Sequence, residues 1–257
     1  MTNAERFSLK DKVALVIGGS SGIGREIALG YREAGAVVAI LGRTQSKVDE
    51  ATAALRKSDP GAEGYAADVR DMVRLKAVID EVAEQHGRLD VLVNSQGITH
   101  IQPSENFTPE QYDLVVDTNL KSVFFACLEA GRHMLAQGSG SIINIGSVAS
   151  LIGLQQSTPY TISKHGVLGL TRTLGAEWAT RGVRVNAIAP GYFLTDLNRE
   201  KMAPERKAMA VRRTPMGRFG ELDELVGAAI FLASSAASYV TGEIIRVDGG
   251  YLAGGLS

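Results

Sequence analysis

The chain has 257 residues, with 27 basic and 28 acidic side chains and a formal net charge of -1 at pH 7. This length suits one large α/β domain, and the near-neutral charge without a basic stripe disfavours nucleic acid or anionic membranes as partners. Residues 1–12 are polar and predict a loose arm. No apolar run is long enough for a secretory signal or a membrane span, so we expect a soluble cytoplasmic protein.

Cysteine and histidine give no sign of a metal site or a disulfide. Cys127 is the only cysteine and lies in an apolar run, which predicts a buried, inert thiol. The four histidines show no ligand spacing with a cysteine or a carboxylate pair. We expect no metal.

A glycine-rich turn follows the first predicted strand, residues 13–17, whose continuous apolar character is typical of burial on both faces. Helical periodicity begins directly after the turn, at Arg25. Glycine permits a tight turn and close approach of a pyrophosphate, while the helix N-terminus offers free N–H groups. The turn that we predict to bind a nucleotide contains Gly18, Ser20, Ser21, Gly22, Ile23 and Gly24.

The end of the second predicted strand, residues 36–41, bears on the choice of cofactor. An acidic residue at this place would bind a ribose 2′-hydroxyl, but the chain has Gly42, Arg43 and Thr44. A guanidinium pairs well with a phosphate. We therefore predict NADP(H) as the preferred cofactor, with NAD(H) possible, and a solvated surface charge is the alternative for Arg43. Thr44 is also the predicted N-cap of a helix over 45–57.

Strands and helices then alternate, which predicts right-handed crossovers and a parallel sheet within a single domain. We expect helices over 71–86, 109–137, 160–179 and 222–233, and strands that end near Asp68, at Asn94, Gly146, Ala189 and Val247. In such sheets ligands bind beyond the strand carboxyl ends, so Asp68, Asn94 and Gly97 would face the cofactor. Each of them could instead be a turn former. Residues 192–220 are irregular and predict a lid over the substrate.

The chemistry is predicted at Tyr160 and Lys164, which are one helical turn apart and share a face. A neighbouring ammonium favours the phenolate, so we expect Lys164 to lower the pKa of Tyr160 toward neutrality. Ser147 follows a predicted strand thirteen residues upstream. Asn119 is an amide inside an otherwise apolar helix; it would hold a water or a carbonyl, or else lie at the surface.

Together these pieces resemble the short-chain dehydrogenase/reductase family. The matching motifs are Gly18-x-x-x-Gly22-x-Gly24, Asp68-Val69, Asn94-x-x-Gly97, Asn119, Ser147, Tyr160-x-x-x-Lys164 and Pro190-Gly191-x-x-x-Thr195. The resemblance implies one Rossmann-like domain, a doubly wound seven-stranded parallel sheet with helices on both faces, assembled as a homotetramer. The C-terminal third is similar to gluconate 5-dehydrogenase and 3-oxoacyl-[acyl-carrier-protein] reductase members.

The resemblance also implies roles for the matching residues. Tyr160 would exchange a proton with the substrate oxygen, Ser147 would hydrogen-bond that oxygen, and Lys164 would lower the pKa of the tyrosine and bind the nicotinamide ribose. Asn119 would hold a water of the proton relay. The other cofactor contacts would be the glycine turn at the pyrophosphate, Asp68 and Val69 at the adenine, Asn94 and Gly97 on the adenosine side, and Pro190, Gly191 and Thr195 toward the carboxamide.

The chain departs from the family pattern at Ile17, where Thr is usual, and at Ser95-Gln96, where Asn-Ala is common. Neither departure touches the residues of the chemistry. The implied reaction is hydride transfer between a nicotinamide and a secondary alcohol or ketone. Polar residues in the surrounding loops, Thr99, His100, Gln102, Ser150, Gln155 and Gln156, suit a sugar, a sugar acid or a keto ester, unless they are solvated.

Two other classes remain open. The chain could bind NADP as a regulator without turnover, which the complete set of catalytic residues disfavours. It could also be a sugar-nucleotide epimerase or dehydratase of the extended type, which usually needs a larger C-terminal region.

Overall fold

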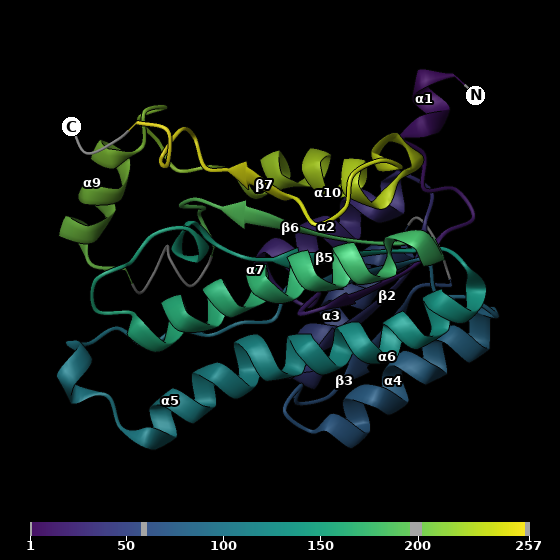
Figure 1. Ribbon diagram of the computed structural model, residues 1–257, viewed down its shortest axis with the longest axis horizontal. Coiled ribbons are helices and arrows are strands. Elements are labelled where there is room, and N and C mark those ends of the chain that lie inside the picture. Colours follow the sequence, from purple (N-terminus) through teal and green to yellow (C-terminus); the bar gives the residue numbers. More distant parts are fainter. Residues whose placement is uncertain (1, 58–60, 196–201, 255–257) are drawn as a thin grey trace.

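The computed structural model describes residues 2–57, 61–195 and 202–254 (Figure 1). Its centre is a parallel sheet of seven strands in the order β3-β2-β1-β4-β5-β6-β7. The strands are β1 (Val13–Ile17), β2 (Val37–Gly42), β3 (Glu63–Ala66), β4 (Val91–Asn94), β5 (Gly140–Ile145), β6 (Val183–Pro190) and β7 (Ile244–Val247). The predicted single-domain, doubly wound fold is confirmed.

Helices cover both faces of the sheet. They are α1 (Asn3–Arg6), α2 (Gly22–Glu33), α3 (Gln45–Arg56), α4 (Met72–His86), α5 (Pro109–Val116), α6 (Ser122–Gln137), α7 (Thr158–Trp178), α9 (Pro204–Arg213) and α10 (Val226–Ala233). Figure 1 shows α4, α6 and α7 together on one side of the strands. The buried side chains of α2, α3 and α10 belong to the core on the opposite side.

The alternation of side chains along β1 explains why two cores form. Ala14 and Val16 pack with α2 and α10, whereas Leu15 and Ile17 point to the other face and pack with α4 and α6. Every residue of β1 is buried. A strand that must be apolar on both faces reads as a continuous apolar run, which is the pattern that the sequence has at this point.

The carboxyl ends of the central strands meet at one edge of the sheet. Ile17 at the end of β1 pairs in register with Leu41 of β2 and Asn94 of β4. The chain order reverses between β1 and β4, because β2 and β3 lie on one side of β1 and the later strands on the other. A crevice opens at such a reversal, and ligands of doubly wound sheets bind there.

The N-terminal segment is more ordered than predicted. Residues 3–6 form the short helix α1, and Thr2 and Glu5 make a capping box at its start. Leu9 is fully buried, and its N–H donates to the carbonyl of Ala34 at 2.9 Å. The prediction of a loose polar arm is therefore wrong, because one apolar side chain is enough to dock the segment on the core.

Three helical predictions need correction in detail. Thr44 occupies the N-cap position of α3, but its side chain makes no capping hydrogen bond. The helix expected over 109–137 contains a π-helical turn, Asp117–Lys121, between α5 and α6. The helix expected from Leu222 begins as the 3₁₀ turn Leu222–Leu225 before α10. The irregular stretch 192–220 includes the helix α9, and its residues 196–201 lie outside the described residues.

Among the described residues, no helix combines the length and the apolar character that crossing a membrane requires. Within the same ranges, no three His, Cys, Asp or Glu side chains are grouped so that they could hold a metal ion.

Candidate nucleotide-binding and active site

A cavity of about 690 Å³ lies at the carboxyl edge of the sheet. Sixteen of the residues predicted for the site line it: Gly18, Ser20, Ser21, Gly22, Ile23, Arg43, Thr44, Asp68, Val69, Gly97, Ser147, Tyr160, Lys164, Pro190, Gly191 and Thr195. Gly24, Asn94 and Asn119 are not among the lining residues. The volume lies within the range of small-molecule and cofactor pockets.

The glycine turn leaves no room for side chains at its critical positions. Gly18 has a φ of +79°, and a Cβ there would lie 2.8 Å from the backbone nitrogen of Gln96. A Cβ on Gly24 would lie 2.3 Å from the carbonyl oxygen of Gly18. Gly24 therefore shapes the turn from behind instead of lining the cavity. In the described part of the chain the amides of Gly22 and Ile23, at the start of α2, have no acceptor, so they can bind an anion.

The far end of the cavity, beyond β2, carries positive charge. A Cβ on Gly42 would come within 2.3 Å of the Ser20 hydroxyl, so an acidic side chain has no space there. Arg43 is exposed and lines the cavity together with Lys47. Lys47 was missed by the sequence reasoning, although it is a cation in the first turn of the predicted helix that follows Arg43.

Asp68 also lies at this end, but a neighbour already holds its carboxylate. Arg70 binds it at 2.6 Å through Nη2 and at 3.1 Å through Nε. This hydrogen bonding, with a smaller contribution from the charge of Arg43, holds the pKa of Asp68 below its usual value. A ligand would meet an ion pair here, not a free carboxylate.

Asn94 is oriented away from the cavity. Its side chain is buried at the end of β4, and Nδ2 donates to Oδ1 of Asn144 at 2.9 Å and to Sγ of Cys127 at 3.4 Å. The predicted buried thiol is confirmed, since Cys127 is fully buried and burial raises its pKa to about 12. The contact of Asn94 with a cofactor stays a prediction.

The three residues that we predict to carry the chemistry, Ser147, Tyr160 and Lys164, lie together between the end of β5 and the first turns of α7. Tyr160 and Lys164 lie on successive turns of α7, with the lysine Nζ 5.7 Å from the centre of the phenol ring. Ser147 follows β5 with its hydroxyl beside the phenol of Tyr160, and this interaction lowers the pKa of the phenol. Its hydroxyl also accepts from the amide of Ala149 at 3.1 Å, which fixes its orientation. Lys164 is buried and donates to the carbonyl of Ile145 at 2.8 Å.

The expected lowering of the Tyr160 pKa is wrong. Burial raises the pKa of Tyr160, and the hydrogen bond from Ser147 offsets only part of this effect. Burial also lowers the pKa of Lys164 to about 8. The physical reason is that the protein surrounds much of the half-buried Tyr160 and nearly all of Lys164, which disfavours the charged form of each.

Asn119 acts on the loop after β4. It lies in the π-helical turn, is fully buried, and holds the backbone of Ile98 at both ends: Oδ1 accepts from its N–H at 2.8 Å and Nδ2 donates to its carbonyl at 2.9 Å. Nδ2 also donates to Ser163 at 3.2 Å. The side chain therefore holds a carbonyl, one of the predicted alternatives, and it is not at the surface.

Most of the polar loop residues predicted to surround a substrate lie outside the cavity wall. Thr99 lines the cavity. Ser150 is buried and accepts from the amide of Ser147 at 3.1 Å. The amide of Gln102 donates to the carbonyl of Gln156 at 3.0 Å, which ties the two loops together. Of these predicted polar residues, only Thr99 lines the cavity.

Several lining residues were not predicted from the sequence. They are Ile101, Leu154 and Ser157 in the loops, and Met202 and Arg206 in the region of the predicted lid. The base of that region is closed: the amide of Gly220 donates to the carbonyl of Tyr192 at 2.9 Å, and the ring of Phe193 packs against Gly220. Of these five residues, only Arg206 could have been predicted from the sequence, because it lies four residues before Ala210 and therefore on the same face of a short helix.

Comparison with known proteins adds the following. The model of a family described as Enoyl-(Acyl carrier protein) reductase matches residues 17–252. D-threitol dehydrogenase of Mycolicibacterium smegmatis is 41% identical over 246 residues, which cover 95% of this chain and 94% of that protein. A 3-oxoacyl-[acyl-carrier-protein] reductase of Thermotoga maritima is 40% identical over 247 residues, covering 94% and 98% of the two chains.

Among solved structures, a gluconate 5-dehydrogenase from Burkholderia cenocepacia in complex with NADP and tartrate is 38% identical and has a TM-score of 0.93, covering 98% of this chain and 99% of that one. These proteins share the length and the fold of the chain. They differ in the substrate that their names state.

Proposed function

Because the chain belongs to the short-chain dehydrogenase/reductase family and is an oxidoreductase acting on CH–OH groups, we propose that it interconverts a secondary alcohol and a ketone with NADP(H). The observation that carries this proposal is the convergence of Ser147, Tyr160 and Lys164 on one cavity that also contains the glycine turn.

The side chains of the site fit the two halves of such a reaction. In reduction, Tyr160 donates a proton to the carbonyl oxygen while Ser147 hydrogen-bonds the same oxygen and stabilises the charge that grows on it. In oxidation the phenolate of Tyr160 takes the hydroxyl proton. Lys164 keeps a positive charge beside the phenol below a pH of about 8. The hydride is the contribution of the bound cofactor.

The cavity fits a dinucleotide phosphate. The amides of Gly22 and Ile23 would hold the pyrophosphate. Gly18, which has no side chain, allows the tight turn that presents these amides to the cavity. At the far end, Arg43 and Lys47 would hold a 2′-phosphate, while the lack of space at Gly42 disfavours the acidic residue that an NAD site uses. NADP is bound in the related gluconate 5-dehydrogenase.

The substrate is a polar carbonyl or alcohol compound, such as a sugar, a sugar acid or a keto ester. Relatives named for D-threitol and gluconate support this range. A 3-oxoacyl-[acyl-carrier-protein] reductase activity is the second candidate, and the Thermotoga maritima relative favours it. A regulator that binds NADP without turnover would not need the ordered Ser147 and Tyr160 pair.

The direct test is a spectrophotometric screen of sugars, sugar acids, keto esters and an acyl thioester, with NADPH and NADH in parallel. We expect NADPH oxidation with a polar ketone and a kcat/KM at least tenfold lower with NADH. Arg43→Ala should raise the KM for NADPH roughly 10- to 100-fold and leave the KM for NADH within a factor of three, because it removes a phosphate contact. Equal use of both coenzymes by the wild type would contradict the assignment of Arg43.

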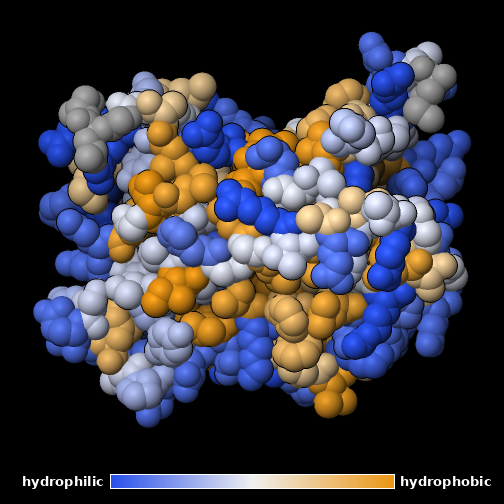
Figure 2. Space-filling view, viewed as in Figure 1, coloured by the Kyte–Doolittle hydropathy of each residue, from blue (hydrophilic) through white to orange (hydrophobic). Residues whose placement is uncertain are grey.

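Two further proposals concern the surroundings of the site. We propose that residues 192–220 form a lid, with ends tied together where Tyr192 meets Gly220. We also propose a homotetramer, as the family resemblance implies. Exposed aromatic residues on α6, Phe124 and Phe125, support an interface on this side, where hydrophobic residues gather over the helix in Figure 2.

A further inference from the structure

Arg206 lies on the face of α9 that turns toward the cavity. Ala210, one turn later on the same face, is 2% exposed, and Arg206 itself is half-buried and lines the cavity. Arg212 on the same helix is exposed and does not line it. The position of Arg206 therefore follows from helical spacing, and only this arginine of the two can meet a bound molecule.

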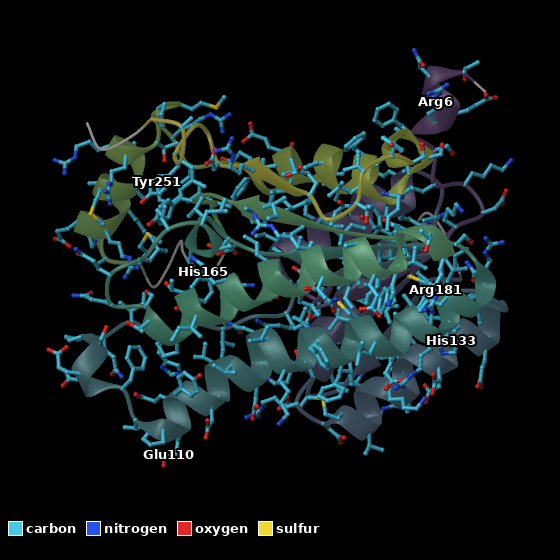
Figure 3. The ribbon with its side chains drawn as sticks, viewed as in Figure 1. Arg6, Glu110, His133, His165, Arg181 and Tyr251 are labelled. Atoms are coloured by element: carbon cyan, nitrogen blue, oxygen red, sulfur yellow. The ribbon has the colours of Figure 1, made fainter. Side chains whose placement is uncertain are left out.

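The guanidinium of Arg206 has no ion pair or side-chain hydrogen bond within the described ranges of the chain. Tyr192 lines the same cavity as Arg206. Burial raises the pKa of Tyr192 to about 12, while the positive charges of Arg206 and Arg213 act in the opposite direction, so both arginines lie near this phenol. Tyr251 lies beside α9 in Figure 3, and Arg213 is 6.0 Å from the centre of its ring.

Among the described residues, no free carboxylate lines this end of the cavity. Asp68 is the only acidic side chain among the described lining residues, and Arg70 holds it beyond β3, away from α7. Asp248 lies beneath Gly191, but its two oxygens accept from the amides of Gly250 and Leu252, each at 2.9 Å. A half-buried, unpaired guanidinium in such surroundings favours an anionic ligand, and its planar fork matches a carboxylate best.

We propose that Arg206 binds the carboxylate of the substrate, so that the substrate is a hydroxylated carboxylic acid or its keto form and not a neutral sugar or ester. This inference rests on the proposed function and narrows it. Two parallel N–H groups on one carboxylate fix the orientation of the molecule, and therefore which carbon faces Tyr160. Arg206 is a specificity residue with no part in the proton transfer.

The test compares acids with their own amides. Aldonic acids of four to six carbons and the matching amides, such as D-gluconate and D-gluconamide, are assayed with NADP for the wild type, Arg206→Gln and Arg206→Lys. The matched control is Arg212→Gln, which removes the same charge from the exposed face of α9. Titration of the NADP-loaded proteins with D-gluconate and with D-gluconamide measures binding separately from turnover.

We expect the wild type to prefer an acid over its amide by roughly 10- to 100-fold in kcat/KM, and Arg206→Gln to lose this preference through a higher KM for the acid. The KM of Arg206→Lys for the acid should lie between those of the wild type and Arg206→Gln, because lysine keeps the positive charge but cannot make two parallel hydrogen bonds to a carboxylate. The KM for NADP and all values for Arg212→Gln should stay within a factor of three. An unchanged KM for the acid in Arg206→Gln would overturn the inference.

The outcomes separate this inference from the proposed function. If amides turn over as well as acids and Arg206→Gln changes nothing, the inference fails and the dehydrogenase assignment stands. If no acid or amide turns over, the dehydrogenase assignment is weakened, and the titration alone decides on Arg206: weaker binding of D-gluconate to the variant supports it and equal binding overturns it. A wild type that uses only an acyl thioester of acyl carrier protein would also overturn it.

Discussion

The side chains of Tyr160 and Ser147 lie together in the cavity, and the serine influences the pKa of the phenol. Partial burial of Tyr160 favours the protonated form of the phenol, and the Ser147 hydroxyl shifts the balance back toward the phenolate. In the proposed mechanism oxidation needs the phenolate and reduction needs the phenol, so the pKa of Tyr160 would set the pH at which each direction is fast.

Ser147→Ala should therefore move the pH profile in a known direction. Removing the hydrogen bond that lowers the pKa of Tyr160 raises this pKa further. The rise of kcat for alcohol oxidation with pH should move to higher pH, and kcat at its plateau should fall roughly 10²-fold or more because the growing charge on oxygen loses a donor. Measurement of kcat for oxidation between pH 6 and 11 checks both effects.

The control for that profile is Ser150→Ala. Ser150 is buried nearby and accepts from the amide of Ser147, but it does not line the cavity. Its loss should reduce kcat without moving the limb on which kcat rises with pH. A limb that moves equally in both variants would show that the shift comes from local loosening and not from the bond to Tyr160.

At the scale of elements, two irregularities build the site. The glycine turn between β1 and α2 brings the backbone of residue 18 against that of residues 95 and 96 at the end of β4. The π-helical turn Asp117–Lys121 interrupts the helix pair α5 and α6 where Asn119 grips the backbone of Ile98. Both devices position the loop after β4, which forms one wall of the cavity. Such π-turns are frequent at functional sites.

Gly24→Ala should damage the turn without unfolding the protein. The added methyl would lie 2.3 Å from the Gly18 carbonyl oxygen, so the turn must shift. We expect the Kd for NADPH to rise roughly tenfold or more, with the far-UV circular dichroism unchanged. Gly227→Ala in α10 is the control, since nothing lies within 4 Å of its new methyl. Fluorescence titration with NADPH checks this, and equal Kd values for the two variants would contradict the account of the turn.

At the scale of the molecule, the exposed aromatic residues of α6 support the proposed homotetramer. Phe124 and Phe125 are 38% and 37% exposed, and Ile162 of α7 is 45% exposed. Light scattering after gel filtration should give a homotetramer for the wild type and a smaller species for Phe125→Asp, because a charge in an apolar interface is costly. Val73→Asp, at an 82% exposed position on α4, should leave the tetramer intact. A monomeric wild type would contradict the proposal.

The sequence predicts the fold well because the features that determine it are local. Continuous apolar strands such as 13–17, the glycine turn and the alternation of strands with helices need no knowledge of distant contacts. Long-range packing decides what was missed. Leu9 docks on the core through one side chain, and the pKa of Tyr160 depends on how much of the protein surrounds it. The role of Arg206 depends on which face of α9 meets the cavity.

The proton chemistry at Tyr160, coupled to hydride transfer from NADPH, is the central claim, and one isotope experiment tests it most directly. The ketone that the screen identifies as a substrate is reduced with NADPH that carries deuterium at the transferred position of C4. The alcohol that forms is analysed by mass spectrometry. We predict one deuterium on the former carbonyl carbon, and a Tyr160→Phe variant that binds NADPH within threefold of the wild type but forms this alcohol at least 10²-fold more slowly. An alcohol without deuterium, or a Tyr160→Phe variant that keeps most of the rate, would contradict the account.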